Sequence, residues 1–311
     1  MNKYLVTGGA GFIGSHITEE LVKRGHEVRV VDNFLTGKRE NIASFLDKIE
    51  LVEGDIRDFE VCKRASEGVD FVLHQAALPS VPRSIKDPLL TNEINIRGTL
   101  NMLLASREVE VKRVVFASSS SVYGDDPQLP KKEGSEGSPL SPYAVSKRVG
   151  EMYCQVFSRI LGLSTVCLRY FNIFGPRQDP LSQYAAVIPN FITRMLKEEK
   201  PVIFGDGEQS RDFTYVSNVV EANILASEAQ DVSGEIFNIA YGERTTVNSL
   251  AARINEILME EISPSYDEPR PGDVKHSFAD ISKAKKMLKY EPLVPFDEGL
   301  KESIRWYRER K

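Results

Sequence analysis

The chain has 311 residues, 41% hydrophobic and 27% charged, which is ordinary for a globular protein with room for one large or two smaller domains. Its 40 basic and 45 acidic side chains give a net charge of −5 without a dominant basic block, which disfavours nucleic acid and anionic membranes as partners. No apolar run is long enough to span a membrane and the N-terminus lacks a signal-peptide pattern, so we expect a cytoplasmic protein.

Short apolar segments rich in β-branched residues alternate with segments of helical periodicity in the first half of the chain. Residues 15–25 and 95–109 are two of the expected helices. Strands that alternate with helices predict a parallel sheet covered on both faces, which is the Rossmann-type doubly wound α/β fold. The expected strands cover residues 3–8, 27–32, 49–55, 69–77, 111–119 and 164–171.

The second half of the chain is less regular. An expected helix over residues 185–199 lies among Gly- and Pro-rich turns, and a helix over 212–230 precedes a strand over 234–240 that could return to the sheet. Two further helical patterns and a Pro-rich passage complete the sequence, which predicts a smaller, interleaved C-terminal lobe. We expect a main domain of residues 1–174 plus about 211–240, and a lobe of residues 175–210 and 241–311.

The cysteines and histidines form no pattern of metal ligands. Cys62, Cys154 and Cys167 fit no metal-site spacing, and the last two lie in amphipathic or apolar segments typical of buried small side chains. The four histidines are scattered and form no ligand pair. We therefore expect reduced thiols and no metal.

A glycine-rich segment, TGGAGFIG, follows the first strand and opens the first helix. Gly8, Gly11 and Gly14 suit a tight turn, a close approach of the backbone to a pyrophosphate, and close helix packing. The helix N-terminus offers free N–H groups to the phosphates. Asp32 closes the second strand, where an acid can hold a ribose 2′-hydroxyl and repel a 2′-phosphate. The pattern favours NAD over NADP, although a purely structural turn with a capping Asp remains an alternative.

Other residues at strand ends fit the same cofactor edge. Asp55 ends the third strand, where it can reach the adenine, and Ala76 and Ala77 end the fourth, where small side chains let a cofactor approach the backbone. Each also has a structural interpretation, as a helix cap or as packing. Lys38 and Arg39 are the only hint towards NADP, and we interpret them as solvated.

The fifth strand ends in FASSSSVYG, which brings the serines of residues 118–121 to that edge. The next helix begins at a Ser-Pro pair and carries Tyr143 and, one turn later, Lys147. A phenol has a pKa near ~10, and a nearby cation can lower it by roughly one to three units. Ser, Tyr and Lys would then remove a proton from an alcohol beside NAD, unless the pair are only neighbours on a helix face.

These motifs together resemble the extended short-chain dehydrogenase/reductase family. TGGAGFIG, SSSSVYG and YAVSK carry the resemblance, and LRYFNIFGPRQDP, GDGEQSRDFTYV and EPRPGDV extend it over nearly the whole chain. The later segments look like the nucleotide-sugar branch, and within it like the UDP-hexose 4-epimerases. The resemblance implies transient oxidation at carbon 4 of a UDP-sugar by tightly bound NAD.

The resemblance also implies a set of site residues. Ser119, Tyr143 and Lys147 would be catalytic, and Arg211 and Arg270 would hold the diphosphate with their guanidinium forks. Cofactor contacts would come from Gly8, Gly11, Phe12, Ile13, Gly14, Asp32, Asn33, Asp55, Ile56, Ala76, Ala77, Asn95, Ser118, Tyr143, Lys147 and Tyr170. Substrate contacts would come from Ser119, Ser120, Ser121, Asn172, Val187, Asn190, Phe204, Arg211, Arg270, Asp273 and Ser277.

Three positions bear on the reaction and the sugar. Ser120 and Ser121 stand where the dehydratase and decarboxylase branches carry acids, which disfavours both reactions. Ser277 lies where, in the family, a Tyr goes with plain UDP-hexoses and a small residue with enzymes that also take N-acetylated ones. We expect UDP-GlcNAc and UDP-GalNAc as substrates, together with UDP-glucose and UDP-galactose.

Other functions stay open at this point. A UDP-glucuronate 4-epimerase would need a cation for the carboxylate, such as Arg83 or Lys86. A net reductase would need NADPH, against Asp32, and a non-catalytic dinucleotide sensor would not need Tyr143 or Lys147. The resemblance implies a homodimer built on the helices that follow Asn95 and Tyr143.

Overall fold

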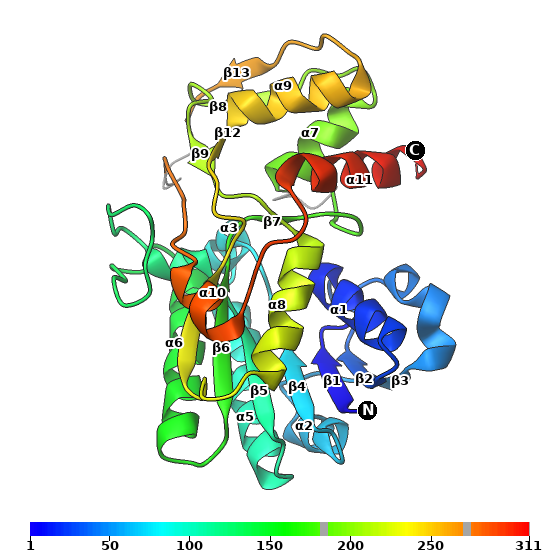
Figure 1. Ribbon diagram of the computed structural model, residues 1–311, viewed down its shortest axis with the longest axis vertical. Coiled ribbons are helices and arrows are strands. Elements are labelled where there is room, and N and C mark those ends of the chain that lie inside the picture. The colour runs from blue at the N-terminus through cyan, green and yellow to red at the C-terminus, as the bar shows by residue number, and fades with distance from the viewer. Residues whose placement is uncertain (181–185, 270–274, 311) are drawn as a thin grey trace.

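The computed structural model describes residues 1–180, 186–269 and 275–310, and its centre is a seven-stranded sheet (Figure 1). The strand order is β11-β6-β5-β4-β1-β2-β3, and every neighbouring pair is parallel. The predicted doubly wound α/β fold is confirmed. The strands are β1 (Lys3–Thr7), β2 (Glu27–Asp32), β3 (Glu50–Glu53), β4 (Phe71–His74), β5 (Arg113–Ser119), β6 (Thr165–Tyr170) and β11 (Glu235–Ile239).

Helices cover both faces of this sheet. One face packs against α2, α5 and α6 through a core that includes Val72, Val114 and Phe157, and the other packs against α1 and α8 through Ile17, Val115 and Val219. These apolar strands, buried on both faces, are what a parallel sheet requires. The helices are α1 (Phe12–Lys23), α2 (Phe59–Ser66), α3 (Val81–Lys86), α4 (Pro88–Asn92), α5 (Gly98–Glu108), α6 (Pro142–Arg159) and α8 (Val216–Glu228).

Apart from α10, which packs against β11 and α8 beside the main sheet, the remaining elements form a smaller group above the carboxyl ends of the strands (Figure 1). Their own core includes Phe174, Phe191, Ile254, Phe296 and Leu300. Three two-stranded pairs, β7–β10, β8–β13 and β9–β12, join segments that are distant in the sequence. The elements are β7 (Ile173–Phe174), α7 (Val187–Met195), β8 (Val202–Phe204), β9 (Ser210–Arg211), β10 (Thr214–Tyr215), β12 (Thr245–Thr246), α9 (Val247–Leu258), β13 (Ser265–Asp267), α10 (Ser282–Leu288) and α11 (Phe296–Arg308).

Several elements differ from the expected ones, among them α3 and α4, which were not expected from the sequence. The helix expected over residues 95–109 begins at Gly98, and a π-helical turn, Glu93–Arg97, precedes it. Such turns change the direction of side chains locally and are frequent near functional sites. The short helix α10 was not predicted from the sequence.

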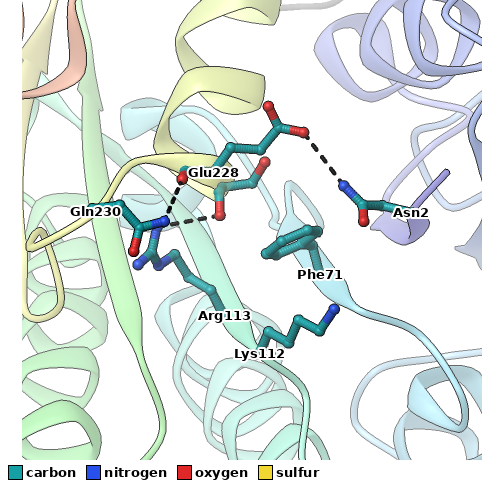
Figure 2. A pocket seen from close by; sticks show the side chains of 7 residues that line it. Asn2, Phe71, Lys112, Arg113, Glu228 and Gln230 are labelled. Atoms are coloured by element: carbon teal, nitrogen blue, oxygen red, sulfur yellow. Dashed lines mark hydrogen bonds between the residues drawn. The ribbon is translucent and has the colours of Figure 1, made fainter.

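A cavity of about 410 Å³ lies at the amino ends of β1, β4 and β5, far from the edge that the glycine loop occupies (Figure 2). Arg113 lines it, but its guanidinium donates to the carbonyls of Ala226, Ser227 and Ala229 at 2.6–3.2 Å. These carbonyls lie at the C-terminal end of α8 and lack intrahelical partners. Arg113 is therefore a helix cap that comes from the sheet.

Candidate active site

The glycine loop leaves no room for side chains. A Cβ on Gly14 would lie 2.2 Å from the Gly8 carbonyl oxygen, and one on Gly8, which has φ +66°, would lie 2.9 Å from Ala76 Cα. Gly11 caps α1 without a side-chain hydrogen bond, and the first turn of α1 carries no acid. Backbone N–H groups at this helix start can therefore meet an anionic group closely, as a pyrophosphate requires.

Asp32 stands beside this loop at the end of β2. Its carboxylate accepts the Ala10 N–H at 2.9 Å and the Phe34 N–H at 2.8 Å, while burial raises its pKa. An ionised carboxylate has about four acceptor sites, so two remain for a ribose diol. Arg39 pairs with Glu53 at 2.5 Å and Lys38 lies 3.7 Å from Asp179, so these cations are paired with acids and not simply solvated.

Asp55 is held in place two residues beyond β3. Arg57 binds its two carboxylate oxygens at 3.0 and 2.7 Å, and the Asn33 amide donates to it at 2.8 Å. The guanidinium of Arg57 lowers the pKa of Asp55 to about 2. Asn33 and Asp55, both predicted to contact the cofactor, thus lie side by side.

The helix α6 carries the predicted catalytic pair, and its start is well defined. Ser141 is the N-cap, and its hydroxyl accepts the Ala144 N–H at 3.1 Å, with Pro142 at the first helical position. The Ser119 hydroxyl at the end of β5 lies close enough to the phenol of Tyr143 to lower the pKa of that phenol. Lys147 Nζ donates to the Ala117 carbonyl at 2.7 Å and lies 5.9 Å from the Tyr143 ring centroid. Ser119, Tyr143 and Lys147 are therefore together.

The electrostatics of this group differ from the expectation. Burial raises the pKa of Tyr143, and the Ser119 hydrogen bond opposes this only in part. Burial also lowers the pKa of Lys147 to about 8. The expectation that Lys147 lowers the phenol pKa is therefore wrong for the chain's own groups, because the ammonium is committed to a carbonyl and is not in direct contact with the phenol.

Three predicted cofactor contacts have their side-chain polar atoms engaged inside the protein. Ser118 Oγ donates to Glu151 at 2.6 Å. The amide of Asn95 binds the Leu78 backbone N–H and carbonyl at 2.7 and 3.2 Å. The Tyr170 hydroxyl bonds Gln75 and Asn223 at 3.1 and 3.0 Å. These residues support the strand ends and loops that form the site.

Glu151 also belongs to a buried ion cluster. Arg169 is fully buried on β6, opposite Ser118, and binds both Glu151 oxygens at 2.7 and 2.8 Å and Glu136 at 2.5 Å. Arg148 reaches the same two acids at 3.0 and 3.3 Å. The cluster ties α6, β6 and the loop before α6 together beside the serines at the end of β5.

The predicted substrate residues lie on the smaller group of elements. Asn172, with φ +40°, donates to the Asp212 carbonyl at 3.3 Å, and Arg211 donates to the Lys275 carbonyl at 3.1 Å. The Ser277 N–H donates to the Ser210 carbonyl at 3.0 Å. The backbone of residues 210–212 thus brings Asn172, Arg211 and Ser277 together.

The other substrate residues are more dispersed. Val187 and Asn190 lie in the first turn of α7, and Phe204 ends β8; all three are half-buried. Arg270 and Asp273 lie outside the described residues. Ser120 and Ser121 form the 3₁₀ turn that follows β5.

Sequence reasoning missed two supporting residues. Glu151 could have been found, since it lies one turn after Lys147 on the inner face of α6. Ser84 could not have been found, because Tyr143, whose N–H its hydroxyl accepts, is distant from it in the sequence.

Two further observations concern the whole described chain. In residues 1–180, 186–269 and 275–310, no helix is both long and apolar enough for a transmembrane span, and no group of three or more His, Cys, Asp or Glu side chains could hold a metal ion. Cys62, Cys154 and Cys167 are buried free thiols.

Residues 4–240 match the NAD dependent epimerase/dehydratase family. Three solved structures are similar over nearly the whole chain. The UDP-N-acetylglucosamine 4-epimerase from Methanobrevibacter ruminantium, in complex with UDP-N-acetylmuramic acid, is 42% identical with a TM-score of 0.96 and 100% and 99% of the two chains covered. The UDP-glucose 4-epimerase from Thermotoga maritima, with UDP-glucose, is 41% identical with a TM-score of 0.94 and 99% of each chain covered. The UDP-glucuronic acid 4-epimerase from Bacillus cereus, with UDP-glucuronic acid and NAD, is 33% identical with a TM-score of 0.92 and 99% and 100% covered.

Proposed function

The chain belongs to the NAD dependent epimerase/dehydratase family, and we propose that it is a 4-epimerase of UDP-N-acetylglucosamine and UDP-N-acetylgalactosamine that also accepts UDP-glucose and UDP-galactose. NAD is the cofactor of this family. The observation that carries the proposal is the proximity of Ser119, Tyr143 and Lys147, at the sheet edge that also holds the glycine loop and Asp32.

Bound NAD supplies the oxidation and the later reduction at carbon 4 of the sugar. The start of α1 would bind its pyrophosphate, and Asp32 its ribose. Tyr143 takes the proton of the 4-hydroxyl and returns a proton after the sugar has turned over, while Ser119 shares the hydrogen bonds of both hydroxyls. Lys147 places a positive charge 5.9 Å from the phenol ring for the moment when Tyr143 is ionised.

The substrate range rests on the small residue at position 277. The Ser277 N–H donates to the carbonyl of Ser210, which precedes Arg211 in β9, so Ser277 lies beside Arg211. A UDP diphosphate held at Arg211 would therefore bring its sugar near the Ser277 side chain. A serine there leaves space for an acetamido group. The similarity to a UDP-N-acetylglucosamine 4-epimerase supports this choice.

The first experiment uses purified protein without added cofactor, incubated separately with UDP-GlcNAc and UDP-glucose, and proton NMR of the products. We expect both 4-epimers to form, with loss of roughly 10²–10⁴-fold in rate in Tyr143→Phe, because general acid–base catalysis contributes about that much. Failure of the wild-type protein to convert either sugar, even with added NAD⁺, would contradict the proposal.

The substitution Ser277→Tyr tests the substrate range. A bulky ring would occupy the acetamido space, so we expect the rate on UDP-GlcNAc to fall by about tenfold or more relative to that on UDP-glucose. The ratio of kcat/KM for the two sugars, measured by coupled assay, checks this. An unchanged ratio would show that Ser277 does not determine the range.

UDP-glucuronate 4-epimerisation is a second candidate. The helix α3 carries Arg83 and Lys86 at the edge of the sheet where the sugar would lie, and either could pair with a uronate carboxylate. If UDP-glucuronate is converted and the neutral sugars are not, this candidate replaces the first. No turnover of any UDP-sugar would favour a dinucleotide sensor.

We also infer a homodimer. Val145, Met152, Val156 and Ile160 form an exposed apolar stripe along α6, at spacings that place them on one helix face. Exposed apolar patches on the outside of a folded domain usually mark a contact surface. The division into a main domain and an interleaved lobe, with the boundaries expected from the sequence, is likewise part of this proposal.

A further inference from the structure

The backbone N–H of Tyr143 is bound by a side chain from another helix. The N–H groups in the first turn of a helix have no intrahelical acceptor. Pro142 has no N–H, and Ser141 accepts that of Ala144. The remaining donor, Tyr143 N–H, is accepted by the hydroxyl of Ser84 on α3 at 3.1 Å.

The orientation of Ser84 is fixed. Its hydroxyl proton goes to the Val81 carbonyl at 2.7 Å, which leaves the oxygen lone pairs for Tyr143. The side chain is only 1% exposed, so water does not compete. The segment before α3 is also held, because both backbone groups of Leu78 bind the amide of Asn95.

The helix α3 lies near the position expected for a bound sugar. It follows β4 and lies at the carboxyl ends of the strands, beside the start of α6 (Figure 1). Ligands in parallel α/β sheets bind at that edge. The backbone of Tyr143 is therefore held by Ser84, while its phenol faces Ser119.

We propose that Ser84 is a positioning residue for Tyr143. Ser84 fixes the first turn of α6 so that the phenol of Tyr143 faces Ser119. It thereby couples the position of α3 to the acid–base group. This inference rests on the proposed role of Tyr143. Removal of the Ser84 hydroxyl would leave a buried N–H without an acceptor, so the turn would shift to find another partner.

The kinetic test is Ser84→Ala with UDP-GlcNAc. We expect kcat to fall about tenfold while KM stays within about twofold, because a small displacement of a catalytic group affects the chemical step and not sugar binding. The acidic limb of the kcat profile should move to higher pH, because a weaker Ser119 contact raises the phenol pKa. Ser84→Thr keeps a hydroxyl and should restore most of the rate.

A second measurement needs no substrate. Tyrosinate absorbance is titrated in the wild-type and Ser84→Ala proteins, each minus its Tyr143→Phe counterpart, which isolates the Tyr143 phenol. We expect a higher pKa in the Ser84→Ala pair. If both the titration and the kcat profile match the wild type, the positioning role is wrong.

The control is Ser303→Ala. Ser303 is fully buried in α11 and donates to the Gly299 carbonyl at 2.7 Å, so its loss matches the packing and hydrogen-bond change at Ser84 without touching α6. It should leave the titration and kcat unchanged. A wild-type protein that converts no UDP-sugar would overturn the proposed function, yet the Tyr143 titration would still decide the role of Ser84.

Discussion

His74, at the end of β4, is a buried imidazole whose tautomer follows from its neighbours. Thr99 donates its hydroxyl to the Asn95 carbonyl at 2.6 Å, so towards His74 Nε2 it can only accept. His74 therefore carries its proton on Nε2, and the Thr7 hydroxyl donates to Nδ1 at 2.7 Å. Thr7 in turn accepts the Ala76 N–H at 3.0 Å. This chain joins β1, β4 and the π-helical turn beneath the cofactor edge, and it needs a neutral imidazole.

The pH dependence of the free energy of unfolding should report this requirement for a neutral imidazole at His74. Burial lowers the pKa of His74 to about 3, while an unfolded chain would protonate it near ~6.5. Below that pH the unfolded state binds more protons, so stability present at neutral pH is lost as the pH falls towards about 3. We expect the wild-type protein to lose about 2 kcal/mol more than His74→Asn between about pH 7.5 and about pH 5 in urea unfolding. Equal pH dependence in the two proteins would contradict this.

The site residues differ in whether their positions are determined by nearby sequence or by contacts with distant elements. Gly8, Gly14, Tyr143 and Lys147 could be predicted because a motif of a few residues fixes the turn or the helix face that carries them. The engaged hydroxyl of Ser118 could not, since its partner lies on another element. The pKa of Tyr143 was mispredicted for the same reason, because burial is a property of the packed structure.

At the scale of elements, the ion cluster of Arg169 with Glu136 and Glu151 holds β6, α6 and, through Ser118, β5 in register. The strands could be predicted from their apolar patterns, and all seven are in the sheet. The inward path of the loop that carries Glu136 could not, because its sequence is polar and its anchor is a buried arginine on β6. The π-helical turn also depends on tertiary contacts of Asn95.

Removal of one member of this cluster should be costly. Arg169→Met leaves the buried carboxylates of Glu136 and Glu151 with only the more exposed Arg148, and we expect a loss of about 3–5 kcal/mol in the free energy of unfolding. Adding Glu151→Leu should recover part of it, which a double-mutant cycle measures. The exposed pair of Arg305 and Glu302 is the control, since Arg305→Met should cost less than about 1 kcal/mol. Additive losses for Arg169 and Glu151 would rule out coupling.

At the scale of the whole molecule, the segment after β7 fastens the smaller group of elements to α1. His16 bonds the Pro176 carbonyl at 2.9 Å, and Arg177 pairs with Glu19 at 2.5 Å. The residues proposed to bind UDP and those proposed to bind the dinucleotide are therefore linked by short polar contacts between α1 and residues 176–177. Motifs locate each half of the site, but these contacts between them appear only in the folded chain.

The apolar stripe on α6 makes a prediction about assembly. Met152→Glu combined with Val156→Glu would place charges in the proposed dimer contact, so we expect the dimer to become a monomer by size-exclusion chromatography with light scattering. Leu293→Glu, which changes an exposed leucine elsewhere, should leave the dimer intact. A wild-type monomer, or a double variant that remains dimeric, would contradict the proposed interface.

The last strand to join the sheet, β11, has a consequence for biosynthesis. It can pair with β6 only after the intervening segment, which includes β10 and α8, has been synthesised. Until then the nascent chain presents β6 as an open edge, and unpaired strand edges invite pairing with other chains. Any fragment that stops before Glu235 keeps this edge of β6 open permanently, so we expect such fragments to aggregate when expressed alone, while in those that extend past Ile239 β6 is paired on both sides and β11 forms the edge.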